Sequence, residues 1–132
     1  VDYMFYDLFK DYKELQAETL NSSYFINDGK GNFTRKDMPQ ELQLTPLFSF
    51  QRTGNSFFAG GNFFGVIPYE GRYDASSFLY FTAANKGSIS QTKILDIKGE
   101  VRDLEWLRTA KYGNVLVAAK NNDSLSFYTI KK

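Results

Sequence analysis

The sequence contains no cysteine and no histidine among its 132 residues. The absence of cysteine excludes disulfides, thiol nucleophiles and cysteine-ligated zinc or iron–sulfur sites. The absence of histidine excludes a Ser-His-Asp triad and histidine-ligated metals. The charge is nearly balanced, with 16 Lys and Arg against 15 Asp and Glu, whereas a dedicated nucleic-acid binder needs a strong basic excess. We therefore expect neither thiol nor histidine chemistry, and no nucleic-acid partner.

Long apolar runs are also missing. No segment approaches the ~20 apolar residues that a membrane-spanning helix needs, so we expect no membrane insertion. Aromatic residues, by contrast, make up 17% of the chain, which favours strands and a well-filled core. A chain of this length fits a single domain, 1–132.

The first 20 residues predict an amphipathic helix over 1–20. Apolar side chains recur there at spacings of three and four, which places them on one helix face: Met4, Phe5, Leu8, Phe9, Tyr12 and Leu15. Asp2 can cap the N-terminus of this helix, and Asn21–Ser23 can end it. The segment has more acidic than basic residues, so we expect the helix to pack on a sheet rather than on a membrane surface.

From residue 24 onward the pattern predicts strands. Short apolar and aromatic runs alternate with turns rich in Gly, Asn, Asp and Lys, which suit the positive φ angles of tight turns. The predicted strands are Tyr24–Ile26, Phe33–Thr34, Leu47–Phe50, Ser56–Ala59, Phe63–Ile67, Phe78–Ala83, Ile89–Leu95, Val101–Leu107, Val115–Ala119 and Ser124–Ile130. The predicted fold class is all-β with one N-terminal α-helix.

A weak internal repeat divides the chain into units 24–76 and 77–132. Tyr24–Phe33 is similar to Leu79–Ile89, and Phe57–Asn62 is similar to Val117–Asn122. Each unit reads as roughly one four-stranded sheet, which is the form of a propeller blade. We therefore expect a partial β-propeller of two to three antiparallel four-stranded blades, too few to close a ring. Its exposed faces and edges predict a homo-oligomer, association with the missing blades, or a chain that folds back into a compact sandwich.

Six segments in order resemble FG-GAP/VCBS repeats. Asn27–Phe33 resembles their N-x-G-x-G-x-F turn, and the others resemble segments of one bacterial branch: Met38–Pro39 with Gln43 and Pro46, Gly60–Gly65, Glu70–Ser76, Lys98–Leu104 and Ala118–Leu125. The whole match resembles the C-terminal segment of a Bacteroidetes-type FG-GAP/VCBS β-propeller protein. This resemblance implies a noncatalytic binding module, secreted, periplasmic or on the outer surface of a bacterium, with a protein or glycan partner. The start of this chain does not resemble a signal peptide.

The resemblance also raises the question of calcium. Such blades often carry a loop of several Asp residues, whereas the corresponding interval here, Gln51–Asn55, holds no carboxylate. Calcium binds six to eight oxygens, usually with several from carboxylates, so we expect no metal and no other cofactor. Asn27, Asp28 and Asn32 could supply a partial oxygen cluster, but the residues favour the interpretation as a hairpin turn.

Charged and aromatic residues in the matching segments are the candidate ligand-binding residues: Tyr69, Arg72, Tyr73, Asp74, Glu100 and Arg102. The arginines could bind carboxylates or sugar hydroxyls. The alternative is a structural salt-bridge network between neighbouring sheets. Trp106, Tyr69, Tyr73 and Phe64 could form a platform for sugar rings, although Trp106 also suits the core.

No catalytic residues are predicted. Two carboxylates at ~5–10 Å could support glycoside hydrolysis, but the spacing of Glu70, Asp74, Glu100 and Asp103 singles out no pair. Gly60–Gly65 lacks the Gly-Lys-Ser/Thr ending of a phosphate loop. The alternatives to a binding module are a carbohydrate-active enzyme or lectin-like accessory domain, and a purely structural segment that completes a propeller.

Overall fold

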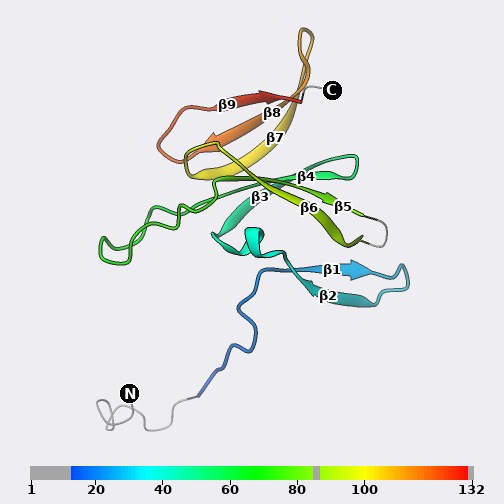
Figure 1. Ribbon diagram of the computed structural model, residues 1–132, viewed down its shortest axis with the longest axis vertical. Coiled ribbons are helices and arrows are strands. Elements are labelled where there is room, and N and C mark those ends of the chain that lie inside the picture. Colours follow the sequence, from blue (N-terminus) through cyan, green and yellow to red (C-terminus); the bar gives the residue numbers. More distant parts are fainter. Residues whose placement is uncertain (1–12, 85–86, 131–132) are drawn as a thin grey trace.

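The chain folds into three antiparallel sheets stacked one on another (Figure 1), in a computed structural model that describes residues 13–84 and 87–130. The first layer is a hairpin of β1 (Ser23–Asn27) and β2 (Phe33–Asp37), followed by the short 3-10 helix η2 (Gln40–Gln43). The middle layer has the order β3-β4-β5-β6 and the last has the order β7-β8-β9. Their bounds are β3 Leu47–Thr53, β4 Ser56–Gly61, β5 Phe78–Ala83, β6 Ile89–Leu95, β7 Val101–Thr109, β8 Gly113–Lys120 and β9 Ser126–Thr129.

The predicted all-β class is confirmed for the described residues, and most predicted strands occur close to their predicted bounds. The strands Phe78–Ala83 and Ile89–Leu95 appear with the predicted ends, as β5 and β6. The sheets have two, four and three strands, so only the middle layer is a four-stranded unit. The boundary between 76 and 77 falls between β4 and β5, inside that sheet.

The prediction of a helix over 1–20 is wrong where it can be compared with the structure. Residues 1–12 lie outside the described residues, and residues 13–20 are not helical. Leu15 is 81% exposed and Leu20 is 89% exposed. A helix this short depends on burial of its apolar face, and these side chains have no surface to pack on.

The predicted strand Phe63–Ile67 is also wrong. Only Phe63 pairs, through an isolated antiparallel bridge to Tyr73 within the long β4–β5 connection. Strands are stable as members of a ladder, and this connection runs beyond the edge of the sheets, where no neighbouring strand continues the pairing. Gly65 and Pro68 further weaken any strand in this segment.

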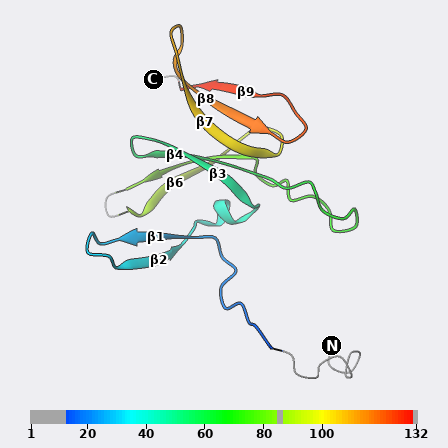
Figure 2. The ribbon, with the colours of Figure 1, turned by 180° about the vertical axis from the view of Figure 1, so that it is seen from behind.

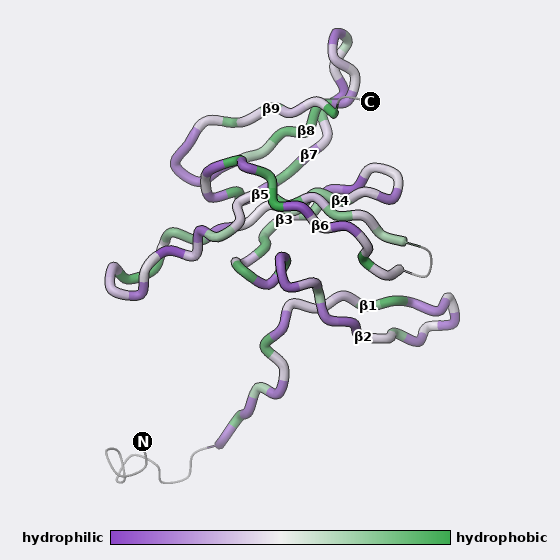
Figure 3. The backbone as a smooth tube through the Cα atoms, viewed as in Figure 1, coloured by the Kyte–Doolittle hydropathy of each residue, from purple (hydrophilic) through white to green (hydrophobic). Residues whose placement is uncertain are grey.

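The middle sheet buries both of its faces, and alternation along β4 and β5 explains how. Phe58 and Phe78 point toward the last sheet, where they pack with Val101, Leu104 and Leu116. The intervening residues Ala59, Leu79 and Phe81 point the other way and pack with Leu42 of η2. In Figure 3 the β1–β2 and β3–β4 turns are hydrophilic, and apolar colour gathers along the strands of the larger sheets.

Side-chain hydrogen bonds join the two larger sheets. The Ser49 hydroxyl donates to Asp103 (2.9 Å), the Gln51 amide donates to the Leu104 carbonyl (2.8 Å), and the Trp106 indole N–H donates to the Arg52 carbonyl (3.1 Å). These bonds run from β3 to β7, and they fix how one sheet lies on the other. Within the described residues, no helix has the length and apolar composition that crossing a bilayer requires.

Candidate functional site

The two ends of the stacked sheets differ in their connections. Tight turns join β1 to β2, β3 to β4 and β7 to β8; in Figure 1 the first two lie on the right and the β7–β8 turn lies at the top. The connections that follow β4, β6 and β8 gather at the opposite end, also seen from behind in Figure 2. We call this opposite end, formed by residues 62–77, 96–100 and 121–125, the loop end. The other is the turn end.

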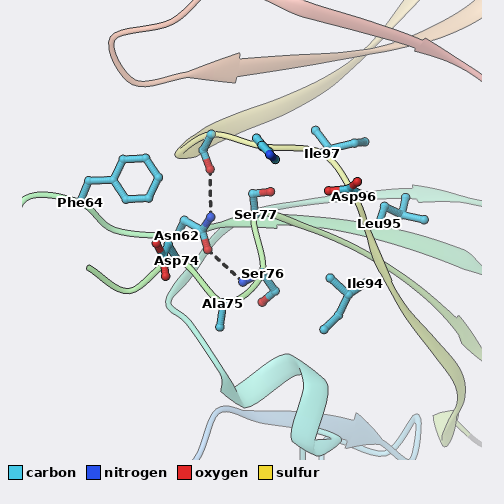
Figure 4. A pocket seen from close by; sticks show the side chains of 12 residues that line it. Asn62, Phe64, Asp74, Ala75, Ser76, Ser77, Ile94, Leu95, Asp96 and Ile97 are labelled. Atoms are coloured by element: carbon cyan, nitrogen blue, oxygen red, sulfur yellow. Dashed lines mark hydrogen bonds between the residues drawn. The ribbon is translucent and has the colours of Figure 1, made fainter. Parts of the chain in front are cut away.

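Asn62 holds the loop end together. It follows Gly60 and Gly61 at the end of β4, has a positive φ of 76° and is 3% exposed. Its side-chain amide donates to the Gly99 carbonyl (3.0 Å) and its oxygen accepts from the Ser76 N–H (3.1 Å), as Figure 4 shows. One side chain therefore ties both ends of the β4–β5 connection to the β6–β7 connection.

Gly60 and Gly61 are required by close packing rather than by a phosphate ligand. A Cβ atom at Gly60 would overlap the side chain of Val101, and one at Gly61 would overlap the Pro46 carbonyl. Both glycines belong to β4. The structure thus uses these glycines for close approach between elements.

Glu100 is the buried charge of the loop end, being 2% exposed. Its carboxylate forms an ion pair with Arg102 and accepts a hydrogen bond from the Asn121 amide (2.9 Å). The Asn121 N–H also donates to the Glu100 carbonyl (2.8 Å). This cluster joins the β6–β7 connection to the β8–β9 connection and satisfies the carboxylate with protein donors, as burial of a charge requires.

Arg102 extends the same cluster onto β3. Its guanidinium lies 4.2 Å from the ring centroid of Phe48 and 5.4 Å from that of Phe63. Contacts of this kind between a cation and an aromatic face are favourable. The side chain is therefore held between a carboxylate and two rings.

Two cavities adjoin at the loop end, sharing Phe64 and Gly99 in their linings. The first, of about 450 Å³, is lined by Asp74, Asp96 and Lys98 together with the hydroxyls of Ser76 and Ser77 (Figure 4). The second, of about 440 Å³, is lined by Arg72, Glu100 and the segment Asn121–Asp123. Both volumes are in the range of small-ligand sites.

The structure brings some of the predicted site residues together and separates others. Arg72 and Glu100 line one cavity, and Asp74 lines the cavity beside it. Arg72 also lies over the ring of Phe64, at 5.2 Å from its centroid. Tyr73 pairs through its backbone with Phe63, and its side chain is half exposed.

The predicted aromatic platform is not a single surface. Tyr69 is 85% exposed and lines neither loop-end cavity. Trp106 is partly buried against the core beside Phe58 and lies toward the turn end, across the sheet from Phe64. Trp106 therefore lies apart from the other three aromatic residues, which belong to the β4–β5 connection.

Asp123 is the titratable group of the loop end with a shifted pKa. The Lys120 ammonium donates to its carboxylate (2.6 Å), and the Ser124 N–H donates as well (2.7 Å). These hydrogen bonds, with that from Lys120 the largest cause, lower the pKa of Asp123 below its ordinary value of 3.8. Asp123 is therefore an anion at neutral pH at the rim of the second cavity.

In the β1–β2 turn, side-chain oxygens accept hydrogen bonds from other residues of the same turn. The Asp28 carboxylate accepts from the Lys30 N–H (2.7 Å), the Asn32 N–H (3.1 Å) and the Asn32 amide (2.7 Å). The Asn27 side chain accepts from the Gly29 N–H (2.8 Å). Hydrogen bonds of this kind build a hairpin turn. Asp28 has a lowered pKa, chiefly because of the Asn32 side chain.

The β3–β4 turn does not fit a calcium ion, because its side chains provide no carboxylate and Arg52 donates to the Gly54 carbonyl there (2.6 Å). Among the residues described, no group of three or more acidic side chains gathers as a metal site would require.

Asn62, Asp96 and Asp123 are loop-end residues that the sequence analysis missed as site residues. Asn62 follows two glycines at a strand end, and asparagine is the residue that best tolerates a positive φ after glycine, so this signal was available. Comparison with family models, curated proteins and solved structures finds no match for this chain. The site must therefore be interpreted from its own geometry.

Proposed function

We propose that this chain is a noncatalytic binding module that takes a glycan or protein ligand at the loop end. The observation that carries the proposal is the pair of adjoining cavities, built by three connections far apart in sequence and lined by both acidic and basic side chains. Their size suits one or two sugar units, and carboxylates, arginine and hydroxyls are the groups that hydrogen-bond sugar hydroxyls. A glycan is therefore the ligand that these cavities favour.

Within this proposal the residues have different roles. Arg72 and Asp74 lie in the long β4–β5 connection, line the two cavities and would contact the ligand. Glu100 and Arg102 are already paired with each other, and they hold the connections in place. Glu100 therefore has a structural role, in keeping with the alternative of a salt-bridge network. Arg72 would instead contact the ligand.

We further propose that the sheets form part of an FG-GAP/VCBS-like β-propeller, exported to the periplasm or outer surface of a bacterium. The similar segments support this, since Phe57–Asn62 and Val117–Asn122 lie on β4 and β8, each the second strand of its sheet and each leading to the loop end. In the other similar pair, Tyr24–Phe33 runs from β1 to the first residue of β2, and Leu79–Ile89 runs from β5 to the first residue of β6.

The assembly part of the proposal is tested by absolute molar mass in solution, from light scattering on an eluting peak. We expect a closed oligomer, because the sheets leave edges and outer faces open. A stable monomer would exclude a ring formed by several copies of this chain. The binding site would then be confined to the loop end of a single chain.

The binding part is tested by amide NMR titration with a panel of neutral tri- and tetrasaccharides of glucose, mannose, galactose and xylose. We expect shifts in 62–77, 96–100 and 121–125, and at least tenfold weaker binding in Arg72→Gln and in Asp74→Asn. Arg35→Gln, on the β1–β2 hairpin, is the matched control and should bind normally. If no saccharide of the panel shifts an amide resonance at the loop end, the result would favour the alternative that the chain is a purely structural segment of a propeller.

The noncatalytic part is tested with the same panel by assay of released reducing ends, which we expect to be absent. The Glu100 carboxylate is engaged by Arg102 and Asn121, and Asp103 accepts from Ser49, so neither is poised as a free acid or base. Hydrolysis that disappears in Asp74→Asn or Glu100→Gln would establish the carbohydrate-active enzyme instead.

A further inference from the structure

A third cavity, of about 820 Å³, opens at the turn end between the middle and last sheets. Thr53 and Ser56, which flank the β3–β4 turn, line it together with Tyr112, Gly113 and Asn114 of the β7–β8 hairpin. Its residues belong to neither loop-end cavity, and its volume lies in the range of small-ligand sites. We call it the turn-end cleft.

The inner part of the turn-end cleft is aromatic. Phe58, Tyr80 and Trp106 line it, with Phe58 in contact with both other rings at centroid distances of 5.4 and 5.9 Å. The Trp106 indole N–H is already bonded to the Arg52 carbonyl, so this residue offers a ligand its ring rather than its donor. The Tyr80 and Ser56 hydroxyls bond each other at 3.0 Å and add a polar point beside the rings.

The charged residue in the lining of the cleft is basic. Arg108 of β7 and Tyr112 of the β7–β8 turn line it, and Lys111 lies 4.9 Å from the Tyr112 ring centroid. No acidic residue is among the residues that line the cleft, and Arg108 has no ion pair with any residue in the described ranges. The loop-end cavities differ, because each has an aspartate in its lining.

We propose that the turn-end cleft is a second ligand site, which binds a sugar ring that carries a carboxylate, as in a hexuronic acid. The apolar C–H face of a pyranose ring suits an aromatic surface, and Trp106 and Tyr112 provide rings of the amphipathic kind found at such sites. A guanidinium pairs with a carboxylate through charge-assisted hydrogen bonds, which is the role of Arg108. This site does not depend on the loop-end proposal.

The test uses the fluorescence of Trp106, which is the single tryptophan of the chain and lies in the cleft. The whole chain is titrated with trigalacturonic acid and, as the matched neutral ligand, with its fully methyl-esterified form. We expect a saturable change in emission with the acid and at least tenfold weaker binding of the ester. Added salt should weaken binding of the acid alone, because the ion pair is screened.

Two variants locate the site. Arg108→Gln changes an exposed side chain and should leave the fold intact, with an unchanged far-UV spectrum and unliganded emission. It should weaken binding of the acid at least tenfold and abolish the difference between acid and ester. Tyr112→Ala should weaken both ligands, and Arg72→Gln at the loop end should weaken neither.

Three results would overturn the proposal. The first is no change in emission with the acid at millimolar concentration, and the second is equal binding of acid and ester. The third is a response to a nucleoside monophosphate without a response to the uronate, which would assign the cleft to nucleotides.

Discussion

The two ends of the stacked sheets use the same strands to build different surfaces. At the loop end, connections of up to 16 residues (62–77) leave and re-enter the sheets, and buried polar side chains hold them. At the turn end the described connections are short, and the surface between the sheets is formed by aromatic rings and the basic side chain of Arg108. Long connections bring backbone polar groups that must be satisfied, whereas tight turns satisfy their own and leave side chains from the strands to form the surface.

Because of this difference, the two ends are stabilised by different interactions. The loop end depends on a few polar contacts, each of which joins two or three segments. The turn end depends on the packing of rings between the sheets. Substitutions should therefore destabilise the two ends by different mechanisms.

The largest expected effect is from Phe58→Ala. Phe58 is 8% exposed and contacts Phe78, Tyr80 and Trp106 between the sheets. Its truncation leaves a cavity and should lower the free energy of unfolding by about 3–5 kcal/mol. Urea unfolding followed by Trp106 emission measures the change. A loss below about 1 kcal/mol would contradict a packed contact between the sheets.

Arg102→Gln should cost about 2–3 kcal/mol, because it leaves the buried Glu100 carboxylate without its ion-pair partner. This figure lies below that for fully buried pairs, since the Arg102 side chain is 34% exposed. The double variant Glu100→Gln/Arg102→Gln should recover part of the loss, as measured in a double-mutant cycle. Additive losses would show that the two side chains do not act as a pair.

Asn62 and Asn122 form a matched pair for the next effect, since both have positive φ, 76° and 51°. Asn62→Ala loses two side-chain hydrogen bonds and should cost about 2–4 kcal/mol, whereas the exposed Asn122→Ala should cost only the ~1 kcal/mol of backbone strain. Asn62→Gly removes the strain and should be less damaging than Asn62→Ala. Thermal unfolding compares the three, and equal losses at both positions would contradict the linking role of Asn62.

The smallest effect concerns acid titration. The pKa values of Asp123 and Asp28 should both lie below 3.8, so each contributes stability that is present above pH 3.8 and lost as the pH falls through the lowered pKa. Lys120→Gln should raise the pKa of Asp123, and Asn32→Ala should raise that of Asp28. Salt should raise the pKa of Asp123 more, because its partner is charged. Carboxyl NMR titration gives both values, and the same salt response at both would contradict this account.

Much of the fold could be predicted from the sequence. The aromatic runs at Phe78–Ala83 and Ile89–Leu95 are bounded by turn residues, and their strands form with the predicted ends. Phe63–Ile67 has similar local composition, but no strand lies beside it beyond the sheet edge. The same limit applies at 13–20, where Leu15 and Leu20 follow the helical spacing without a surface to pack on.

The candidate site could be predicted only in part. Arg72 and Glu100 are both predicted ligand-binding residues, and they line the same cavity. They do so because both lie in connections at the loop end. Sequence spacing does not give strand register, and in the structure Trp106 and Phe64 lie toward opposite ends. The turn-end cleft could not be predicted, because Arg108 and Phe58 meet only when one sheet lies on the other.

The central claim is that the two ends bind ligands of different charge at separate sites. An amide NMR titration of the whole chain with one neutral and one uronic-acid oligosaccharide of equal length tests it most directly. The account predicts two separate sets of shifts, with the neutral sugar at 62–77, 96–100 and 121–125, and the acidic sugar near Thr53–Ser56 and Arg108–Asn114. A single set of shifts shared by both sugars, or no shifts at either end, would contradict it.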